Sequence, residues 1–301
     1  MDDNSTDNTA EVLKSFKDSR IKYFKNEKNL GYSGNIEKCR RKAQNDILFL
    51  MGQDDILAKE TLQKVHDAFV DYPQIGAVTR VYYWFDKDIK KPVRAKFPIS
   101  EKHDSIVSVY DDPKKIIQMF QSLDQLSGLA YRRKWIDIDF HKDVFPCHVY
   151  PFASIFKKHP VAFLKDYTIA VRISTSQTRS LSSIYNKSPV QSWIDMFNNV
   201  FFEKNFESLK NYMIKNFVAT NYIGLVQIRN YARYSYLLRE IYFLLKYQPE
   251  NVFSLSFWFF SLGCLIMPAR LLIPLVDWYK NSINFKKLKR IDFEYSLRRT
   301  S

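Results

Sequence analysis

The first 85 residues alternate between helical and strand-like patterns of hydrophobic and polar positions. Asn8, followed by Glu11, resembles a capping box and predicts a helix that begins there. The same patterns predict further helices over residues 33–43 and 62–69, and strands over residues 21–24, 46–51 and 77–85. Repeated strand–helix–strand units favour an α/β fold.

The segment from residue 46 to residue 51 is an almost continuous apolar run. Such a run is typical of a strand that is buried on both faces of a parallel sheet. It ends directly in the sequence Gly52-Gln53-Asp54-Asp55. Because ligands of open α/β sheets gather beyond the carboxyl ends of the strands, these polar residues are expected to line a binding crevice.

Beyond about residue 173 the pattern becomes mostly helical. Residues 174–188 are rich in Ser and Thr and predict a linker or loop, and helical spacing then continues to about residue 247. Residues 251–269 carry no charge but include serines, a glycine and a proline, and a membrane span needs about 20 apolar residues. Three interpretations fit this segment: an interfacial or re-entrant helix, a full membrane span, or a buried helix hairpin. The basic residues that follow favour attraction to an anionic membrane surface.

Composition narrows the classes of partner. The net charge is +14 and the pI is near 9.4, so an anionic partner is favoured. The sequence has no zinc-finger spacing and no RNA-recognition signature, which argues against nucleic acid. The three cysteines are scattered and indicate free thiols in a reducing compartment. The length allows one large domain, or one domain with a helical appendage.

Two acidic clusters carry the candidate chemistry. The first is the run Asp2-Asp3-Asn4-Ser5-Thr6-Asp7, and the second is the pair Asp54-Asp55. Each precedes a helix-like segment, so an acidic residue that only caps a helix is the simpler interpretation. The other interpretation is a site for a divalent cation and a diphosphate, because Mg²⁺ or Mn²⁺ prefers carboxylate oxygens together with substrate phosphate oxygens.

Three motifs together resemble family-2 inverting glycosyltransferases. Residues 2–7 resemble the family's DDxSxD turn, residues 26–35 its N-x-G-x-x-x-N segment, and residues 48–57 the strand that leads into its DxD-type motif. The resemblance is strong over residues 2–85, thinner to about residue 173, and absent beyond. It implies a GT-A fold, which is a mixed α/β sheet flanked by helices that binds a nucleotide-diphosphate sugar.

The resemblance also implies roles for individual residues. Asp54 would ligate the divalent metal, and Asp55 would lie beside the sugar and diphosphate as a catalytic residue. Gly52 departs from the pattern, because many members carry an Asp there, and the metal site would have one carboxylate fewer. The residues that match nucleotide-sugar-binding positions are Asp2, Asp3, Ser5, Asn29, Gly31, Asn35 and Gln53.

An inverting transfer needs a general base that deprotonates the acceptor hydroxyl. The family usually carries an acidic residue for this purpose at the start of a late helix, but the matching stretch, residues 145–151, has none. His148 is the nearest group that accepts protons near neutral pH. Asp143 and Asp139 are the carboxylate alternatives, and an ordinary loop role for His148 is equally open.

The resemblance further predicts an incomplete sheet. In the GT-A fold the Asp-Asp turn follows the second strand, whereas here only Met1 precedes it. We therefore expect the first strands to be missing from between the strands predicted at residues 21–24 and 46–51. On this basis the chain is expected to be N-terminally truncated, or to have a misassigned start, and to be poorly soluble alone.

The sequence thus predicts three segments and one function. The segments are an incomplete GT-A-like domain over residues 1–175, a helical extension over residues 176–250, and a membrane-associated apolar helix with a basic tail over residues 251–301. The function is inverting transfer of a sugar from a nucleotide-diphosphate donor to an acceptor hydroxyl, with Mn²⁺ or Mg²⁺ as cofactor. A lipid-linked or glycan acceptor is expected, in bacterial surface polysaccharide (O-antigen or capsule) synthesis at the cytoplasmic face of the cell membrane.

Two other functions fit the sequence less fully. The departure at Gly52 and the absent acidic base favour a catalytically inactive homologue that acts as a membrane-bound scaffold. An anionic-lipid binder without a nucleotide site is the third interpretation.

Overall fold

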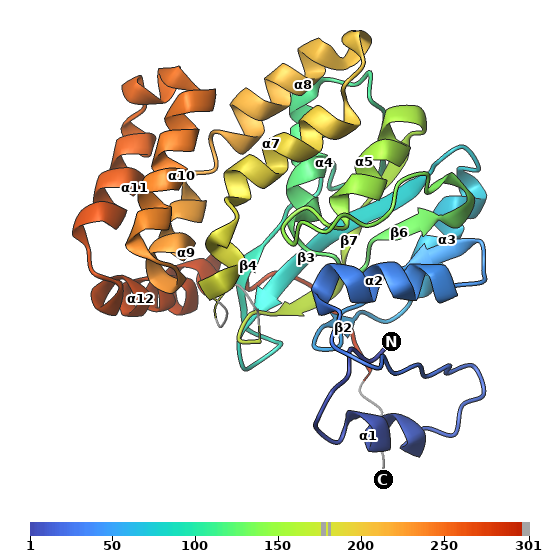
Figure 1. Ribbon diagram of the computed structural model, residues 1–301. Helices are drawn as coiled ribbons and strands as arrows, with labels where there is room; N and C mark the ends of the chain where they lie inside the picture. Colours follow the sequence, from blue (N-terminus) through green and yellow to red (C-terminus); the bar gives the residue numbers. More distant parts are fainter. Residues whose placement is uncertain (176–178, 180–181, 297–301) are drawn as a thin grey trace.

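The computed structural model describes residues 1–175, 179 and 182–296. A seven-stranded mixed sheet lies in the middle, with helices on both faces, which confirms the α/β class (Figure 1). The strands are β1 Ile47–Phe49, β2 Ile56–Leu57, β3 Ala77–Phe85, β4 Pro92–Ala95, β5 Ser105–Val107, β6 Ala130–Arg132 and β7 Val161–Arg172. The helices are α1 Thr9–Ser15, α2 Gly31–Lys42, α3 Thr61–Asp71, α4 Pro113–Gln121, α5 Val149–Lys158, α7 Pro189–Val200, α8 Glu207–Met213, α9 Ile223–Tyr231, α10 Tyr234–Tyr247, α11 Leu255–Ile266, α12 Ala269–Trp278 and α13 Phe285–Leu288.

Three strands of the sheet run in the same direction. The order is β1-β6-β3-β7-β2, with β4 paired to β3 and β5 paired to β7. Among the strands of the described residues only β3 and β7 pair in parallel, with Ala77 opposite Val161 and Phe85 opposite Arg172. The other strand pairs are antiparallel, so β1, β3 and β7 point toward the same end of the sheet. The turn after β1, which contains Asp54 and Asp55, reaches the end of β7 at Arg172.

The predicted strand at residues 46–51 forms, but its expected pairing is wrong. We expected a strand buried on both faces of a parallel sheet, whereas β1 is short, lies at the end of the sheet and pairs antiparallel with β6. Leu48 and Leu50 are buried, but their neighbours Ile47 and Phe49 are only half-buried. A continuous apolar run indicates burial, and it does not specify which strand lies alongside.

The strand predicted at residues 21–24 is also wrong. In this region only Lys25 pairs, in a single parallel bridge with Asp2, and Ile21 and Phe24 are exposed. The segment lies with α1 away from the sheet (Figure 1), so its alternating apolar residues have no core to face. Helix α1 forms as predicted, and it buries none of its residues. Its expected capping box is absent, because the Asn8 side chain makes no capping hydrogen bond.

Two cores cover the two faces of the sheet. On one face α4, α5, α7 and α8 pack against strand residues such as Val81, Tyr131 and Phe163. On the other face α3 packs against Val78 and Ala162 through its own buried side chains. Successive residues of a strand point to opposite faces, which is why β3 is buried along its whole length and contributes to both cores.

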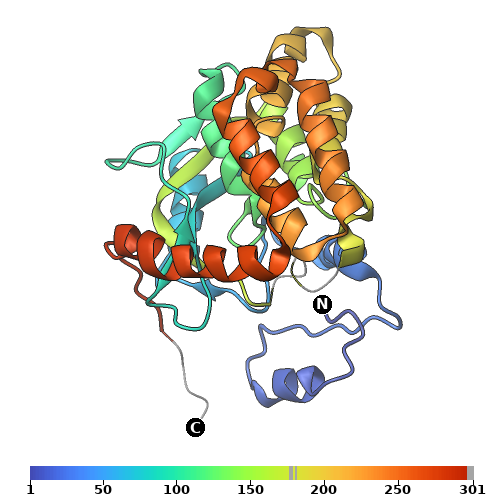
Figure 2. The ribbon, with the colours of Figure 1, turned by 90° about the vertical axis from the view of Figure 1, so that its left-hand side faces the viewer.

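The C-terminal helices form a third core beside the sheet. Helices α9, α10, α11 and α12 gather on one side of the molecule (Figure 1) around a cluster that includes Leu225, Leu244 and Phe257. Figure 2 views this side of the molecule, where the long helix that begins with α12 lies crosswise below α11. None of the helices in the described part of the chain combines the length and the apolar character needed to cross a membrane.

The chain returns to the sheet around and after α13. The Asn284 side chain donates to the Val93 carbonyl at 2.9 Å, and the Lys59 amide donates to the Glu294 carbonyl at 2.7 Å. Phe293 packs edge-on against Tyr83, with ring centroids 5.1 Å apart. The described part of the basic tail, which was expected at a membrane surface, therefore lies against β3, β4 and the chain that follows β2. The predicted domain boundaries at residues 175 and 250 stay a prediction.

Gly76 gives a direct test of the packing between β3 and the helices. A Cβ atom at Gly76 would lie 2.2 Å from Cγ2 of Ile155, so Gly76→Ala is expected to destabilise the fold by about 1–3 kcal/mol through overpacking. The matched control is Gly263→Ala in α11, where a Cβ meets nothing within 4 Å. There the loss of unfolded-state entropy is expected to stabilise by about 0.4–1 kcal/mol. Urea unfolding of both variants measures the difference, and equal midpoints would contradict this account.

Candidate active site

Groups beside two other strands, β6 and β7, hold the turn after β1 in place. The Ser127 hydroxyl, just before β6, donates to Oδ2 of Asp55 at 2.5 Å and accepts from the Gly52 amide at 2.8 Å. From the end of β7, the Arg172 amide donates to Oδ1 of Asp55 at 3.0 Å. Both carboxylate oxygens of Asp55 are therefore bound by groups distant in sequence, and the side chain has a defined orientation.

Asp54 has a more open position on the same turn. Its carboxylate accepts a hydrogen bond from the hydroxyl of Thr175, and its backbone carbonyl lies 3.4 Å from Nε of Arg172. Gln53 is exposed beside it. Burial raises the pKa of Asp55, while the bonds from Ser127 and Arg172 oppose that rise. The two adjacent carboxylates thus differ: one is anchored and partly desolvated, and the other is accessible.

Gly52 leaves a small space between these groups. A Cβ atom at this position would lie 3.1 Å from Oδ2 of Asp55, 3.1 Å from Oγ of Ser127 and 3.3 Å from Oδ1 of Asp54. The space is therefore lined by three oxygen atoms, two of them carboxylate oxygens. An Asp at this position, as the family often carries, would crowd the two carboxylates in this arrangement. The glycine allows them to converge.

Asp2 is the centre of the first acidic cluster. Its carboxylate accepts from the Ser5 amide at 2.7 Å and from the Tyr23 hydroxyl at 2.5 Å. Those bonds, of which the one from Tyr23 is the strongest influence, lower the pKa of Asp2 to about 2. The predicted binding residues Asp2 and Ser5 are therefore brought together, with Asp2 ionised at physiological pH.

Asp3 joins the N-terminal segment to α2. Its Oδ1 accepts from the Leu30 amide at 2.7 Å and from the Asn26 side chain at 2.9 Å. Asn26 also donates to Asn35 at 3.0 Å, so Asp3 and Asn35 share one partner. Near the same helix start, the Asn29 side chain accepts from the amide of Gly31, which adopts a φ of +73°.

The N-terminal cluster and the acidic turn are separate groups. Among the described residues no hydrogen bond joins the two clusters directly. The hydroxyl of Tyr32, in the first turn of α2, lies 3.2 Å from Nδ1 of His148, and burial raises the pKa of this hydroxyl well above its usual value. The start of α2 is therefore bonded to His148 and not to the acidic turn.

The predicted general bases have their acceptor atoms occupied. His148 is buried, its Nε2 lies 2.8 Å from the Leu123 carbonyl, and its Nδ1 lies 3.2 Å from the Tyr32 hydroxyl. Since a carbonyl only accepts, Nε2 is the donor and Nδ1 accepts from Tyr32. Burial lowers the pKa of His148 to about 4. The ring is therefore neutral near pH 7, and its one acceptor nitrogen is bonded.

The two carboxylate alternatives are held in ion pairs. Asp143 is buried and lies 2.6 Å from Nζ of Lys187. Asp139 is exposed and pairs with Arg40 at 2.5 Å and Arg41 at 3.0 Å on α2. The structure therefore does not bring His148, Asp143 or Asp139 into hydrogen-bond contact with the acidic turn.

Several residues at the turn were not assigned from the sequence. Ser127, Arg172 and Thr175 give no local signal of a role at this turn. Arg80 does give one, because it is a single charge inside the apolar run of β3. Arg132 donates to backbone carbonyls near the end of α3.

The acidic residues do not form a dense metal cluster. Within the described ranges, no group of three or more His, Cys, Asp or Glu side chains is placed to hold a metal ion. A site of one or two carboxylates completed by substrate phosphate is a different arrangement, and it is the one typical of Mg²⁺. The oxygen-lined space at Gly52 has donors of that kind.

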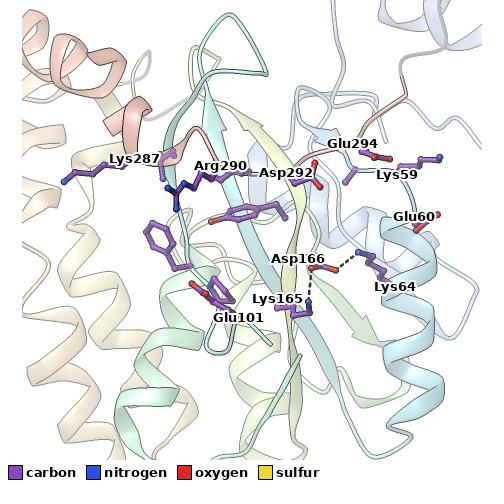
Figure 3. Close-up of a pocket in the computed structure, with 16 residues that line it drawn as sticks. Lys59, Glu60, Lys64, Glu101, Lys165, Asp166, Lys287, Arg290, Asp292 and Glu294 are labelled. Atoms are coloured by element: carbon purple, nitrogen blue, oxygen red, sulfur yellow. Dashed lines mark hydrogen bonds and ion pairs between the residues drawn. The ribbon is translucent and has the colours of Figure 1, made fainter. Parts of the chain in front are cut away.

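A separate cavity of about 520 Å³ lies between the C-terminal segment and α3. Figure 3 shows Lys64 and Lys165 directed at Asp166, which pairs with them at 2.5 and 3.6 Å. Charged side chains of both signs line this cavity, including Lys59, Glu60, Glu101, Lys287, Arg290, Asp292 and Glu294. None of the predicted site residues lines it, so it is distinct from the acidic turn.

Comparison with known proteins agrees with the motifs. Residues 1–138 match the family model described as Glycosyl transferase family 2. The match spans both acidic clusters, Gly52 and Ser127. A search among curated proteins found no match. The first 138 residues are therefore similar to family-2 glycosyltransferases.

Proposed function

We propose that the protein transfers a sugar from a nucleotide-diphosphate donor to an acceptor hydroxyl with inversion of configuration. The observation that carries this proposal is the acidic turn Gly52–Asp55, which Ser127 and Arg172 hold at the carboxyl ends of the strands. The family match supports glycosyltransferase activity in general. The mixed sheet flanked by helices is consistent with the GT-A fold.

Each acidic residue then has a distinct role. Asp54 is the accessible carboxylate and is proposed as a ligand of a divalent cation, Mn²⁺ or Mg²⁺. When bound, such a cation neutralises the charge that develops on the departing diphosphate. Asp55, with both oxygens fixed, is proposed to orient the sugar beside the diphosphate. Gly52 provides the space in which the two carboxylates converge.

The nucleotide is proposed to lie along the start of α2. Asp2, Asp3, Ser5, Asn29, Gly31, Asn35 and Gln53 are the proposed contacts. Hydrogen bonds within this group fix its geometry before any ligand arrives, which lowers the entropic cost of binding. Among the candidates for proton transfer, only Asp55 lies in the acidic turn. His148 and Asp143 would first have to release Tyr32 and Lys187.

We further propose that the protein acts at the cytoplasmic face of the cell membrane on a lipid-linked or glycan acceptor in bacterial surface polysaccharide synthesis. The support is an apolar face on the C-terminal helices. Leu255, Phe259 and Ile266 of α11 are 88%, 74% and 79% exposed, whereas Phe257 and Cys264 on the opposite side are buried. The face consists of Phe253, Leu255, Trp258, Phe259, Leu262, Ile266, Leu271, Leu275 and Trp278.

The charges around this apolar face favour a membrane as its occupant. Helix α11 has no charged residue, and α12 presents exposed Arg270 beside Leu271. Further on, Lys286, Lys287 and Lys289 are exposed. Large apolar side chains flanked by basic ones are the composition that binds an anionic bilayer surface. Helices α11 and α12 lie on the same side of the molecule (Figure 2).

Asp54→Ala tests the enzymatic role. Purified protein is assayed with a panel of nucleotide sugars and Mn²⁺, and turnover is expected to fall about 100-fold or more, as when one group that stabilises transition-state charge is removed. Asp71→Ala, at the exposed end of α3, is the matched control and should keep full activity. A scaffold predicts a different result: no turnover in the wild type, and a biological effect that Asp54→Ala leaves unchanged.

Gly52→Ala tests the space between the carboxylates. The added methyl group would press on side-chain oxygens of Asp54, Asp55 and Ser127, which would have to move by a few tenths of an ångström. We expect turnover to fall about tenfold or more through misplacement of these groups, with a melting temperature close to that of the wild type. Gly224→Ala, where a Cβ first meets Asn221 at 3.5 Å, is the control. Unchanged kinetics in Gly52→Ala would contradict this role.

The double variant Phe259→Ser/Ile266→Ser tests the membrane face. Flotation with vesicles of phosphatidylglycerol and phosphatidylethanolamine should show at least about tenfold weaker binding, since each buried apolar side chain contributes about 1.5–3 kcal/mol. Leu62→Ser/Val70→Ser, at exposed positions of α3, is the control and should bind like the wild type. Unchanged vesicle binding by the first variant would overturn the proposal. It would also be overturned if the wild type were a dimer that does not bind vesicles and the first variant were a monomer.

A further inference from the structure

Arg80 is a buried charge at the centre of the sheet. It lies on β3, and its side chain is 0% exposed. A guanidinium removed from water destabilises a protein by several kcal/mol unless its N–H groups are bonded. The hydrogen-bond partners of these N–H groups therefore identify the part of the structure that depends on Arg80.

All the hydrogen bonds of Arg80 go to one loop. Its Nη1 donates to the Ser122 carbonyl at 3.1 Å, and its Nη2 donates to the carbonyls of Gln125, at 2.9 Å, and of Ser127. The loop passes very close to the guanidinium at Gly128, which adopts a φ of +87°. A Cβ atom there would lie 2.7 Å from Nε of Arg80. The loop from Ser122 to Gly128 is thus shaped around this one side chain.

The same loop orients Asp55. Ser127 offers its carbonyl to Arg80 and its hydroxyl to the Asp55 carboxylate. A second attachment holds the middle of the loop, because Asp124 accepts from the Tyr82 hydroxyl and pairs with Lys96 at 2.9 Å. Since Ser127 has little freedom between these attachments, the position of the Asp55 carboxylate follows from the position of Arg80.

The charge of Arg80 acts in the same direction as these bonds. Burial lowers the pKa of Arg80 to about 10, so the group remains a cation at physiological pH. Burial raises the pKa of Asp55, and the Ser127 bond, the Arg172 amide and the Arg80 charge all oppose that rise. The charge of Arg80 thus favours the same carboxylate that the Ser122–Gly128 loop orients.

We propose that Arg80 is a positioning residue for sugar transfer, which fixes the Asp55 carboxylate in its productive orientation through the Ser122–Gly128 loop. The inference rests on the proposed function, because the productive orientation is defined by the donor sugar. Arg80 itself does not contact the substrate in this account. It differs from a residue needed only for folding in that it controls the orientation of a second residue in the site.

The test compares Arg80→Lys and Ser127→Ala with Arg132→Lys. Lysine keeps the charge at position 80 but cannot reach several carbonyls at once. In both site variants we expect kcat to fall about tenfold or more with a smaller change in KM, because orientation is lost and the donor-binding contacts remain. Arg132 also donates only to carbonyls, so its variant should lower stability and leave kcat and KM unchanged.

A readout that does not require activity separates this inference from the proposed function. The Arg172 amide donates to the Asp55 carboxylate, so its hydrogen exchange reports whether that carboxylate keeps its orientation. Faster exchange of the Arg172 amide in Arg80→Lys and Ser127→Ala, but not in Arg132→Lys, supports the inference even if no nucleotide sugar is turned over. An unchanged exchange rate of this amide in folded Ser127→Ala overturns it, whether or not Arg80→Lys folds.

Discussion

The parallel pairing of β3 with β7 is the constraint on which the rest of the structure depends. It spans β3 from Ala77 to Phe85 and gives both faces of the sheet a continuous apolar surface. Helices α4, α5, α7 and α8 pack on one face, and α3 packs on the other. Because β6 pairs antiparallel with β3, and β1 with β6, the same register also fixes the direction in which β1 ends.

The site follows from that geometry. The end of β7 supplies the Arg172 amide, and the loop before β6 supplies Ser127, so that Asp55 is bound from beside two strands that β3 separates in the sheet. The central strand contributes Arg80, whose unmet hydrogen-bonding capacity draws the Ser122–Gly128 loop against it. A buried cation and a partly buried carboxylate thus share one loop, and each lowers the cost of burying the other.

The C-terminal half combines two surfaces of different character. Helix α11 packs Phe257 and Cys264 inward and presents an uncharged face outward. The chain then returns along α12 and α13 to the sheet, where Phe293 packs against Tyr83 and the Lys59 amide bonds to the Glu294 carbonyl. One continuous segment therefore connects the exposed apolar face to the chain that follows β2, shortly after Asp54 and Asp55.

Local sequence patterns were enough to predict several elements of the fold and the two acidic clusters. The strand at residues 77–85, the helices around residues 33–43 and 62–69, and the two acidic clusters were all found where hydrophobic spacing and motif order placed them. Local pattern failed where an element had no core to face, as at residues 21–24. It also failed where an apolar run left the strand partner open, as at β1.

The hydrogen-bond partners of the acidic residues depend on the folded arrangement of the chain. Ser127 and Arg172 lie 72 and 117 positions from Asp55, and no local pattern links a serine or a backbone amide to a carboxylate at that separation. The sequence suggested His148 and Asp143 as bases because their types accept protons, whereas the fold gave their acceptor atoms to Tyr32 and Lys187. The physical reason is that residue type sets which bonds a group can make, and strand register and packing decide which partner comes within hydrogen-bond distance.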